Sequence, residues 1–598
     1  MRPSATNRGA ANAGTAMTAR SRRRRVSIVA AAILVLVALF VVRLIDIQVV
    51  QAATLNADAV GKRSITSPIY GDRGTIVDTN GKVLADTVLR YDITAAPKFA
   101  QGGYSTTVKG KTTHYTIEQA SQQIAEATGG NTAAILKKLT ASKTSLYANL
   151  IAGVDVAGYQ KIESLGISWL YPVRQTARTY PNGSVAGNLI GFVNGSGAQT
   201  GLELAYDKCL AGTNGSQTYE RGLDGVKLPG STTTTKKAHD GGTLMTTIDA
   251  DLQYQMQQDL DEQVKAIGAS SGTVTVIKVA DGSILADADS SSTDPNNPGA
   301  SNTAASFQSN YEPGSVFKAM TAASLIDSGL ASPASQAIVA DRRDFSWGGF
   351  IGDAESHPVE HLTLAGILAD SSNVGISYMG EKMSAQERYA YMLKFGLGKK
   401  SEVNFPLEGS GSLGNPNTWD KQTNYNSMFG QGVSATAVQV ASIFQTLANG
   451  GVREPLKLVK GCRLADGTVI DTPTGKATRV VSDKAATDVV QMLENTIPEG
   501  TLQGMVPISG YNVSAKTGTA QIADRPGGGY GDDYIISVAG IAPSEDPQYV
   551  VLITFTKPTT LKTSFAAAPA FREIMSQVLE TYRVKPSTVP AANLPDTW

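Results

Sequence analysis

The sequence EPGSVFK, residues 312–318, places a serine and a lysine three positions apart at the expected start of a helix. Residues three apart on a helix lie on one face, one turn apart, so the Lys318 amine can reach the Ser315 hydroxyl. An amine accepts a proton only when it is neutral, and burial lowers the pKa of a lysine toward that state. This stretch therefore predicts a nucleophile, Ser315, with Lys318 as its base.

Two further polar clusters follow in order along the chain. Ser371-Ser372-Asn373 begins 56 residues after Ser315, within a helical stretch. Lys516-Thr517-Gly518-Thr519 begins 143 residues after Asn373, on an expected strand. Alone, each cluster has an ordinary interpretation: an incidental lysine on a helix, a helix cap or loop, and a strand end. Together, and in this order, they indicate a serine acyl-transfer enzyme.

The expected chemistry divides among five side chains. Ser315 attacks a carbonyl carbon, and Lys318 takes the proton from its hydroxyl. Ser371 can pass a proton to the leaving amine, with Lys516 behind it. Asn373 can hold a substrate amide and tether the Lys318 amine.

The last cluster is also expected to bind substrate. Thr517 and Thr519 offer hydroxyls to a carboxylate, and Gly518 lets a substrate backbone lie close to the strand. The backbone N–H groups of Ser315 and Thr519 are the expected oxyanion hole. Such a hole contributes roughly 3–4 kcal/mol in acyl transfer.

Other binding chemistry lacks its sequence signals. His357 and His361 are four residues apart, but Pro358 between them disfavours a zinc-binding helix face, so both are expected on the surface. The sequence contains no GxxxxGK[ST] loop, which argues against a nucleotide enzyme. We therefore expect no metal ion and no cofactor.

The formal net charge of zero conceals an uneven distribution. Residues 1–25 contain seven arginines and no acidic residue, which leaves 45 Lys and Arg against 52 Asp and Glu elsewhere. Because the body of the chain is slightly acidic, it is not expected to bind nucleic acid. The two cysteines, Cys209 and Cys462, are interpreted as small buried apolar residues, with a disulfide between them as the alternative.

An uncharged run from Val26 to Val42 follows four consecutive arginines, Arg22–Arg25. Seventeen residues of helix rise about 26 Å, which is near the lower limit for a membrane span, and snorkelling at Arg43 can extend it. The arginines favour a cytoplasmic N-terminus, so everything after the run is expected outside the cell. The alternative is a cleaved signal peptide with a site near Val50-Gln51-Ala52, but the run is longer than a usual signal core.

The rest of the chain alternates strand-rich and helix-rich stretches. Asn80-Gly81 and Asp281-Gly282 each predict the turn of a hairpin, and residues 230–242 are expected to form a linker or exposed loop. Helices are expected over residues 116–139, 315–328, 362–379, 435–449, 482–497 and 571–582. Strands are expected over residues 512–521, 535–541 and 549–556. This order predicts a mixed α+β fold with a sheet packed against helices.

With these motifs the sequence resembles the class B penicillin-binding proteins, the D,D-transpeptidases of peptidoglycan synthesis. The resemblance covers residues 26–583. Beyond the three clusters it rests on the following blocks: Arg73-Gly74 with Asp78 and residues 80–85, Arg178-Thr179-Tyr180-Pro181 with Ala186 and Ile190-Gly191-Phe192, Thr247-Ile248-Asp249, Phe429-Gly430-Gln431-Gly432, and Gly540-Ile541-Ala542-Pro543. Gly201-Leu202-Glu203 lacks the Gly and Ile or Val that usually follow in the family, which affects the subfamily more than the activity.

The resemblance implies a fold and a domain order. We expect a basic, disordered cytoplasmic tail (1–25), a transmembrane anchor (26–48), an elongated strand-rich pedestal (49–240), a transpeptidase domain with an antiparallel sheet between helices (241–583) and a C-terminal tail (584–598). Residues 526–530 (PGGGY) are expected to form either a mobile lip over the cleft, with Tyr530 near the substrate, or a plain hairpin tip.

The resemblance also implies a function and partners. Ser315 would form an acyl-enzyme from D-Ala-D-Ala stem peptides and would be acylated by β-lactams. The basic tail and single anchor are most similar to the septal FtsI type of actinobacteria, with a SEDS-type glycan polymerase, other divisome membrane proteins and the cytoplasmic membrane as partners. The alternatives are an elongation-type transpeptidase, a D,D-carboxypeptidase and a β-lactam sensor.

Overall fold

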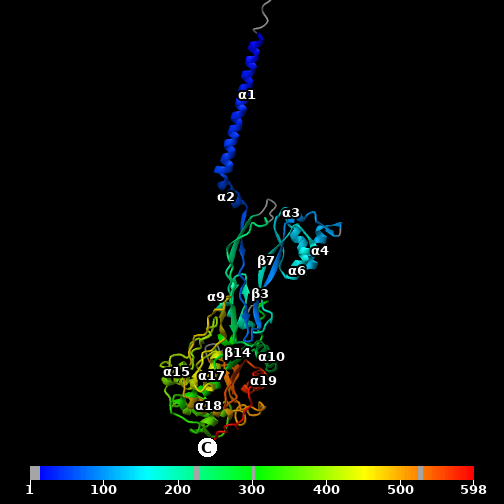
Figure 1. The fold of residues 1–598 in the computed structure, drawn as a ribbon. Helices are drawn as coiled ribbons and strands as arrows, with labels where there is room; N and C mark the ends of the chain where they lie inside the picture. The colour runs from blue at the N-terminus through cyan, green and yellow to red at the C-terminus, as the bar shows by residue number, and fades with distance from the viewer. Residues whose placement is uncertain (1–13, 109, 221–227, 300–302, 506, 523–528) are drawn as a thin grey trace, which may run out of the picture. The chain divides into compact units, whose positions relative to one another are not determined.

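The computed structural model describes residues 14–108, 110–220, 228–299, 303–505, 507–522 and 529–598 (Figure 1). Two compact units emerge from the contacts: one contains the chain up to Gly71 together with Asn214–His239, and the other contains Asp72–Thr213 together with Asp240–Trp598. Both helices and sheets occur, as the mixed α+β prediction requires.

The first unit is a long apolar helix followed by a small sheet. Helix α1 (Gly14–Ile45) continues through a π-helical turn (Asp46–Val50) into α2 (Ala52–Arg63). Within it, Arg22–Val50 is long and apolar enough to cross a membrane, and Arg43 is paired with Asp46 at 2.5 Å. The sheet has the order β1 (Ser64–Ile69), β10 (Gly215–Glu220), β11 (Thr233–Lys236).

Two sequence predictions need correction in this unit. The tail expected to be disordered is helical from Gly14 onward, because the small residues before the arginines extend a helix that the apolar run has already nucleated. Residues 230–242 are also more than a linker, since Thr233–Lys236 pair with β10 as a strand.

Residues 72–213, the part of the predicted pedestal in the second unit, form a strand-rich layer with small helices. Its long strand β3 (Val83–Ala95) pairs antiparallel with β7 (Leu170–Thr179), β6 (Ala148–Val154) and β2 (Ile76–Val77). The remaining strands are β4 (Tyr104–Val108), β5 (Lys111–Tyr115), β8 (Val193–Asn194) and β9 (Gly197–Ala198). The helices are α3 (Pro97–Ala100), α4 (Ile117–Thr128), α5 (Thr132–Thr140), α6 (Val156–Leu165), α7 (Gly187–Ile190), α8 (Gly201–Ala205) and α9 (Asp207–Leu210).

The predicted hairpin at Asn80-Gly81 exists, but its turn is longer than two residues. Val77 pairs with Val83, so five residues form the loop. The Asp78 carboxylate closes this loop by accepting hydrogen bonds from the backbone N–H groups of Asn80 (2.8 Å) and Lys82 (2.7 Å). An aspartate that bonds backbone N–H groups two and four residues ahead stabilises a wider turn than the Asn-Gly pair alone suggests.

Two of the family-like blocks meet at one buried carboxylate in this layer, that of Glu203. Glu203 is fully buried and accepts from Arg73 Nε (2.6 Å) and Arg178 Nε (2.7 Å). Tyr180 donates to the same carboxylate at 3.3 Å, and Arg73 also pairs with Asp207 at 2.6 Å. Two guanidinium groups and a hydroxyl compensate the desolvation of one carboxylate, so segments distant in sequence are held together.

A shared sheet and a disulfide join this layer to the rest of the second unit. Strand β12 (Thr243–Thr246) pairs parallel with β2 and antiparallel with β20 (Val459–Arg463). Next to this junction Cys209 and Cys462, 253 residues apart in sequence, form a disulfide with a Cα–Cα distance of 6.5 Å. The expectation of two unpaired buried cysteines is therefore wrong, because the β12–β20 pairing brings both side chains against Gly242.

The remaining residues build an antiparallel sheet between helices, as predicted. The strand order is β14 (Ile284–Asp289), β13 (Ser271–Lys278), β25 (Tyr549–Thr556), β24 (Tyr534–Ala542), β23 (Ser514–Gln521), and β23 is an edge strand. Helices α10 (Ala250–Ile267) and α19 (Ala568–Thr581) cover one face, while α17 (Ala437–Ala448) and α18 (Asp483–Glu494) cover the other (Figure 1).

Smaller elements complete this part of the chain. The helices and 3-10 turns are α11 (Ala305–Gln308), η2 (Gly314–Phe317), α12 (Lys318–Asp327), α13 (Leu364–Ala369), α14 (Asn373–Gly380), α15 (Ala385–Lys394), α16 (Lys421–Asn426), η3 (Ser427–Phe429) and η4 (Ser564–Ala567). The strands are β15 (Gln336–Val339), β16 (Arg342–Asp344), β17 (Phe350–Gly352), β18 (Glu360–Thr363), β19 (Val452–Arg453), β21 (Val469–Ile470) and β22 (Thr478–Arg479).

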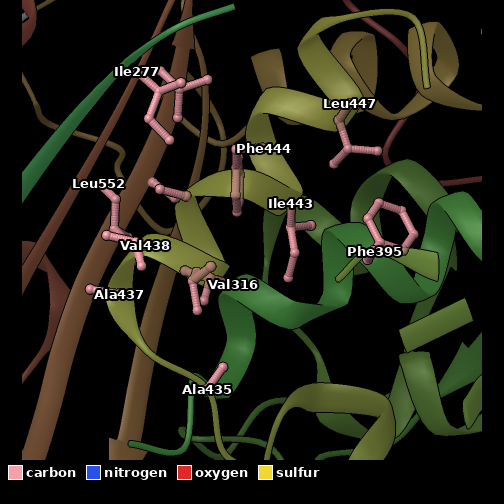
Figure 2. Packing of buried hydrophobic residues seen from close by; sticks show 14 of the residues in the cluster. Ile277, Val316, Phe395, Ala435, Ala437, Val438, Ile443, Phe444, Leu447 and Leu552 are labelled. Carbon is pink, nitrogen blue, oxygen red and sulfur yellow. The ribbon is translucent and has the colours of Figure 1, made fainter. Parts of the chain in front are cut away.

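The main core lies between the sheet and α17. Figure 2 shows Val438 and Phe444 of α17 beside Ile277 and Leu552 of the sheet, with Val316 from the Ser315 turn close by. All five side chains are fully buried. The turn that carries the expected nucleophile is therefore anchored in the main core by the residue next to it.

We expect Glu203→Ala to destabilise the second unit by about 3–5 kcal/mol, because Arg178 loses its buried carboxylate partner and Arg73 keeps only the half-exposed Asp207. Chemical denaturation monitored by circular dichroism measures this change. Lys484→Ala, which removes an exposed ion pair with Asp488, is the matched control and should shift the midpoint little. Equal shifts for both variants would mean that Glu203 does not organise the layer.

Candidate active site

Ser315 lies in a tight turn held from both sides. It belongs to the 3-10 turn η2, and the α-helix α12 begins only at Lys318, so the predicted helix over 315–328 starts three residues late. Gly314 has φ +63°, and a Cβ there would meet Thr519 O at 3.1 Å, so the turn requires glycine. Val316 and Phe317 are fully buried and fix the turn in the core.

The Lys318 amine is buried among serine oxygens. It lies 3.0 Å from Ser315 Oγ and 3.2 Å from Ser371 Oγ, and it also donates to the Ser371 carbonyl. Burial lowers the pKa of Lys318 to about 7, although the nearby Asp353 carboxylate opposes this shift. A substantial fraction of the amine is therefore neutral near pH 7 and able to accept the Ser315 proton.

Ser371 occupies a strained bend between two helices. The helix predicted over 362–379 is interrupted: α13 ends at Ala369, and α14 begins at Asn373 after Ser371 at φ +60°. A non-glycine residue in this left-handed region is uncommon and is kept by its surroundings. Here both lysine amines bond Ser371, and the bend turns its hydroxyl into the cleft.

Asp353 is a site residue that the sequence analysis missed. Its carboxylate accepts from Ser372 Oγ (2.7 Å), from Val374 N (3.0 Å) and from the backbone N–H of Asn373, so it caps the start of α14. It belongs to no motif and precedes the helix it caps by twenty residues. Asp353 reaches the start of α14 because it directly follows strand β17 in the folded protein.

Asn373 and His357 also differ from expectation. The Asn373 side-chain amide donates to Gly352 O at 3.0 Å, while the Lys318 amine that Asn373 was expected to tether is bonded to Ser315 and Ser371. His357 is not simply a surface residue, because its ring lies 3.1 Å from Asp353 Oδ2 and its side chain is 19% exposed.

Lys516 approaches Ser371 from the opposite wall. It lies on the edge strand β23, is fully buried, and donates to Ser371 Oγ at 2.8 Å. Burial, together with the neighbouring Lys318 charge, lowers the pKa of Lys516 well below its usual value, against the weaker effect of Asp370. The Ser371 hydroxyl thus lies between two amines and can exchange protons with either.

Gly518 and Thr519 of this strand lie against the Ser315 turn. Thr519 is exposed toward the cleft, whereas Thr517 is buried and its hydroxyl lies 2.7 Å from that of Thr501. A Cβ at Gly518 would meet Pro313 O at 3.0 Å and would crowd Ser537, so glycine lets the strand pack against the turn. The edge strand leaves backbone groups unpaired beside Ser315, where an oxyanion hole needs them.

The structure describes only part of the segment that was expected to form a lip over the cleft. Residues 523–528 lie outside the described residues, which include Gly529 and Tyr530. The Tyr530 hydroxyl donates to Glu312 Oε2 at 2.9 Å, three residues before Ser315. In the described ranges, no group of three or more His, Cys, Asp or Glu side chains is placed to hold a metal ion.

Comparison with known proteins points to one family. Residues 68–246 match the penicillin-binding protein dimerisation domain, and residues 272–576 match the penicillin-binding protein transpeptidase domain. The chain is 33% identical to penicillin-binding protein PbpB of Mycolicibacterium smegmatis, over 94% of this chain and 91% of that protein. It is 28% identical to peptidoglycan D,D-transpeptidase FtsI of Escherichia coli, over 94% and 93%.

A solved structure shares the fold. Penicillin-binding protein 3 of Mycobacterium tuberculosis complexed with ampicillin superposes with a TM-score of 0.68 at 28% identity. The match covers 89% of this chain and all of the resolved chain of that protein.

We expect acylation of Ser315 by a fluorescent penicillin to accelerate as the pH rises through about 7. Below that pH the Lys318 amine is protonated and cannot take the Ser315 proton, so the rate should fall by roughly tenfold per pH unit. Stopped-flow labelling between pH 5.5 and 9 measures the profile.

His357→Gln is the control for this profile. Burial lowers the pKa of His357, but its hydrogen bonds to Pro358 and Asp353 outweigh this and raise it, so this histidine is a second titratable group beside the site. The profile should survive the substitution. Its disappearance would identify His357, and not Lys318, as the titrating group.

Proposed function

The chain belongs to the class B penicillin-binding proteins, the D,D-transpeptidases of peptidoglycan synthesis, and we propose from this premise that Ser315 is the residue acylated. One observation carries the proposal: two buried lysine amines and two serine hydroxyls from three separate motifs form a continuous series of hydrogen bonds. Each group lies within 3.2 Å of the next, in the order Ser315, Lys318, Ser371, Lys516. The relatives named as D,D-transpeptidases support it.

The first half-reaction forms an ester on Ser315. Its Oγ attacks the carbonyl carbon of the penultimate D-Ala while Lys318 Nζ takes the hydroxyl proton. The negative charge on the carbonyl oxygen is stabilised by the backbone N–H groups of Ser315 and Thr519. When the C–N bond breaks, Ser371 donates a proton to the leaving nitrogen and regains one from the Lys318 ammonium, and terminal D-Ala departs as a neutral amine.

The second half-reaction transfers the acyl group. The amine of a neighbouring stem peptide attacks the ester and loses one proton to the Lys318–Ser371–Lys516 relay, and Ser315 regains its hydroxyl proton. A new amide cross-links two strands, and no cofactor is consumed. Thr517, Gly518 and Thr519 are the proposed binding residues for the donor peptide, and Asn373 the proposed contact for its amide.

A β-lactam enters the same first step. Attack of Ser315 opens the lactam ring, and the cleaved C–N bond leaves the nitrogen attached to the acyl group. Because no fragment departs, the site stays blocked. Ampicillin is bound in the solved structure of the M. tuberculosis relative, which supports this reading.

We propose a single-pass protein with a cytoplasmic N-terminus and an extracellular catalytic domain. The apolar helix from Arg22 to Val50 supports the anchor, and its arginines support the orientation. The Cys209–Cys462 disulfide supports the outside location, because disulfides persist in oxidising compartments. The predicted boundaries, 1–25, 26–48, 49–240, 241–583 and 584–598, stand as the proposed domains.

We place the activity in septal wall synthesis, which the relatives named PbpB and FtsI support. The proposed partners are peptidoglycan stem peptides, a SEDS-type glycan polymerase and other divisome membrane proteins. An elongation role would place the protein along the lateral wall of the cell. A carboxypeptidase would hydrolyse the donor peptide without forming cross-links. For a sensor, a variant that cannot be acylated would fully complement the depletion strain.

Ser315→Ala should abolish covalent labelling by a fluorescent penicillin and fail to complement a depletion strain. It removes the attacking oxygen, while the anchors of the turn, Val316 and Phe317, remain. Gel fluorescence and growth measure the two outcomes, and Ser332→Ala, an exposed serine, is the matched control. Labelling of the Ser315 variant would exclude this nucleophile, and full rescue would make acyl chemistry dispensable.

The disulfide predicts the thiol state of the protein in cells. Protein extracted from membranes without reductant should react with no maleimide-polyethylene glycol, and should gain two adducts after reduction, as measured by gel shift. A Cys209→Ser, Cys462→Ser double variant should gain none in either state. Two reactive thiols before reduction would contradict the proposed outside location.

A further inference from the structure

Residues 584–598, which we call the strap, run along the second unit instead of forming a free tail. Figure 1 shows this red segment beside the helices of the catalytic part. Its backbone is hydrogen-bonded along its length, from Val584 to Trp598. The strap has neither a helix nor a paired strand, so these hydrogen bonds to the rest of the unit are what hold it in place.

One end of the strap is bound to the lead-in of strand β23. The Tyr511 hydroxyl donates to Val584 O at 2.6 Å, and Asn512 donates from its backbone to Ser587 Oγ at 2.9 Å and from its side chain to Val589 O at 3.0 Å. Strand β23 begins two residues later at Ser514. This end therefore holds the wall of the cleft that carries Lys516.

The other end is bound to the start of helix α13. Thr363, the N-cap of this helix, donates from its hydroxyl to Pro595 O at 2.6 Å and from its backbone to Asp596 O at 2.9 Å. A Cβ at Gly366 would overlap the Asp596 carbonyl, so the strap lies directly on the helix. Helix α13 ends two residues before Ser371.

Between these ends the strap is fixed to α18. Asn495 donates to Leu594 O and to Asp596 Oδ1, both at 2.6 Å, and Glu494 accepts from Ala592 N at 2.7 Å. The Trp598 ring packs against His361 of strand β18, with the ring centroids 4.8 Å apart and the ring planes tilted by 53°. Asp370 is the neighbour of Ser371. Its burial, then the Glu360 charge and then the Asp596 charge raise the pKa of Asp370 to about 6.

We propose that the strap is a positioning element for the transpeptidase reaction, acting through Asp596 on the separation between Lys516 and Ser371. It joins the lead-in of the β23 wall to the start of the α13 wall. The two walls meet at the 2.8 Å hydrogen bond between Lys516 and Ser371. This inference rests on the proposed function of those two residues.

The test measures β-lactam acylation of the membrane-extracted full chain and of a variant lacking residues 591–598, which keeps the Tyr511 and Asn512 anchors. Rapid-mixing kinetics with a fluorescent penicillin separate the non-covalent dissociation constant from the acylation rate constant. The deletion should lower the rate constant at least tenfold and change the dissociation constant less than twofold, because Ser371 and Lys516 act in the chemical step.

Point variants and rescue separate positioning from folding. Asp596→Ala, which removes the side-chain bond to Asn495 but keeps the main-chain contacts with Thr363, should reproduce part of the loss, whereas Asp596→Asn, which keeps an oxygen for Asn495, should not. Val589→Ala, an exposed side chain of the same segment, should behave like the parent. A synthetic peptide of residues 590–598 added to the deletion variant should restore the rate constant.

Three outcomes decide the matter. Equal acylation rate constants for parent and deletion, at a temperature where both are folded, overturn the positioning role. A lower melting temperature with an unchanged rate constant does the same and leaves only packing. Failure of the parent to be acylated at all would contradict the proposed function instead of the strap.

Discussion

Two lysine amines, Lys318 and Lys516, lie fully buried on either side of the Ser371 hydroxyl. Burial disfavours the charged form of an amine, and the proximity of a second amine disfavours it further. In the proposed reaction this cost has a use, because a serine nucleophile needs a neutral amine as its base. The rest of the catalytic half can be understood as the structure that keeps both amines dry and within hydrogen-bond distance of serine oxygens.

Each amine is held by a different layer, so the site exists only where the layers meet. Lys318 follows a turn that Val316 and Phe317 fix in the core against α17, and Lys516 sits on the edge strand of the sheet. Ser371 joins them from a bend whose positive φ is kept by its neighbours. Asp353 then caps the following helix, so the bend is fixed on both sides.

In the pedestal layer, residues 72–213, the buried charged group is a carboxylate instead of an amine. One buried carboxylate, Glu203, gathers Arg73 and Arg178 from blocks more than one hundred residues apart, and the Cys209–Cys462 disulfide joins this layer to strand β20. A buried charge and a covalent link each tolerate little displacement. Within the second unit, the Glu203 ion pairs hold the pedestal layer together, and the disulfide attaches this layer to the catalytic part.

The sequence by itself determined the spacing of Ser315 and Lys318, the order of the three motifs, a sheet packed against helices and the apolar run of the anchor. These follow from local spacing and periodicity, which a chain carries without folding. The sequence placed the bend at Ser371 inside a continuous helix and left Cys209 unpaired. Only the tertiary structure decided the Ser371 bend, the Asp353 cap, the disulfide and the strap, because each depends on a contact between segments that no local pattern brings together.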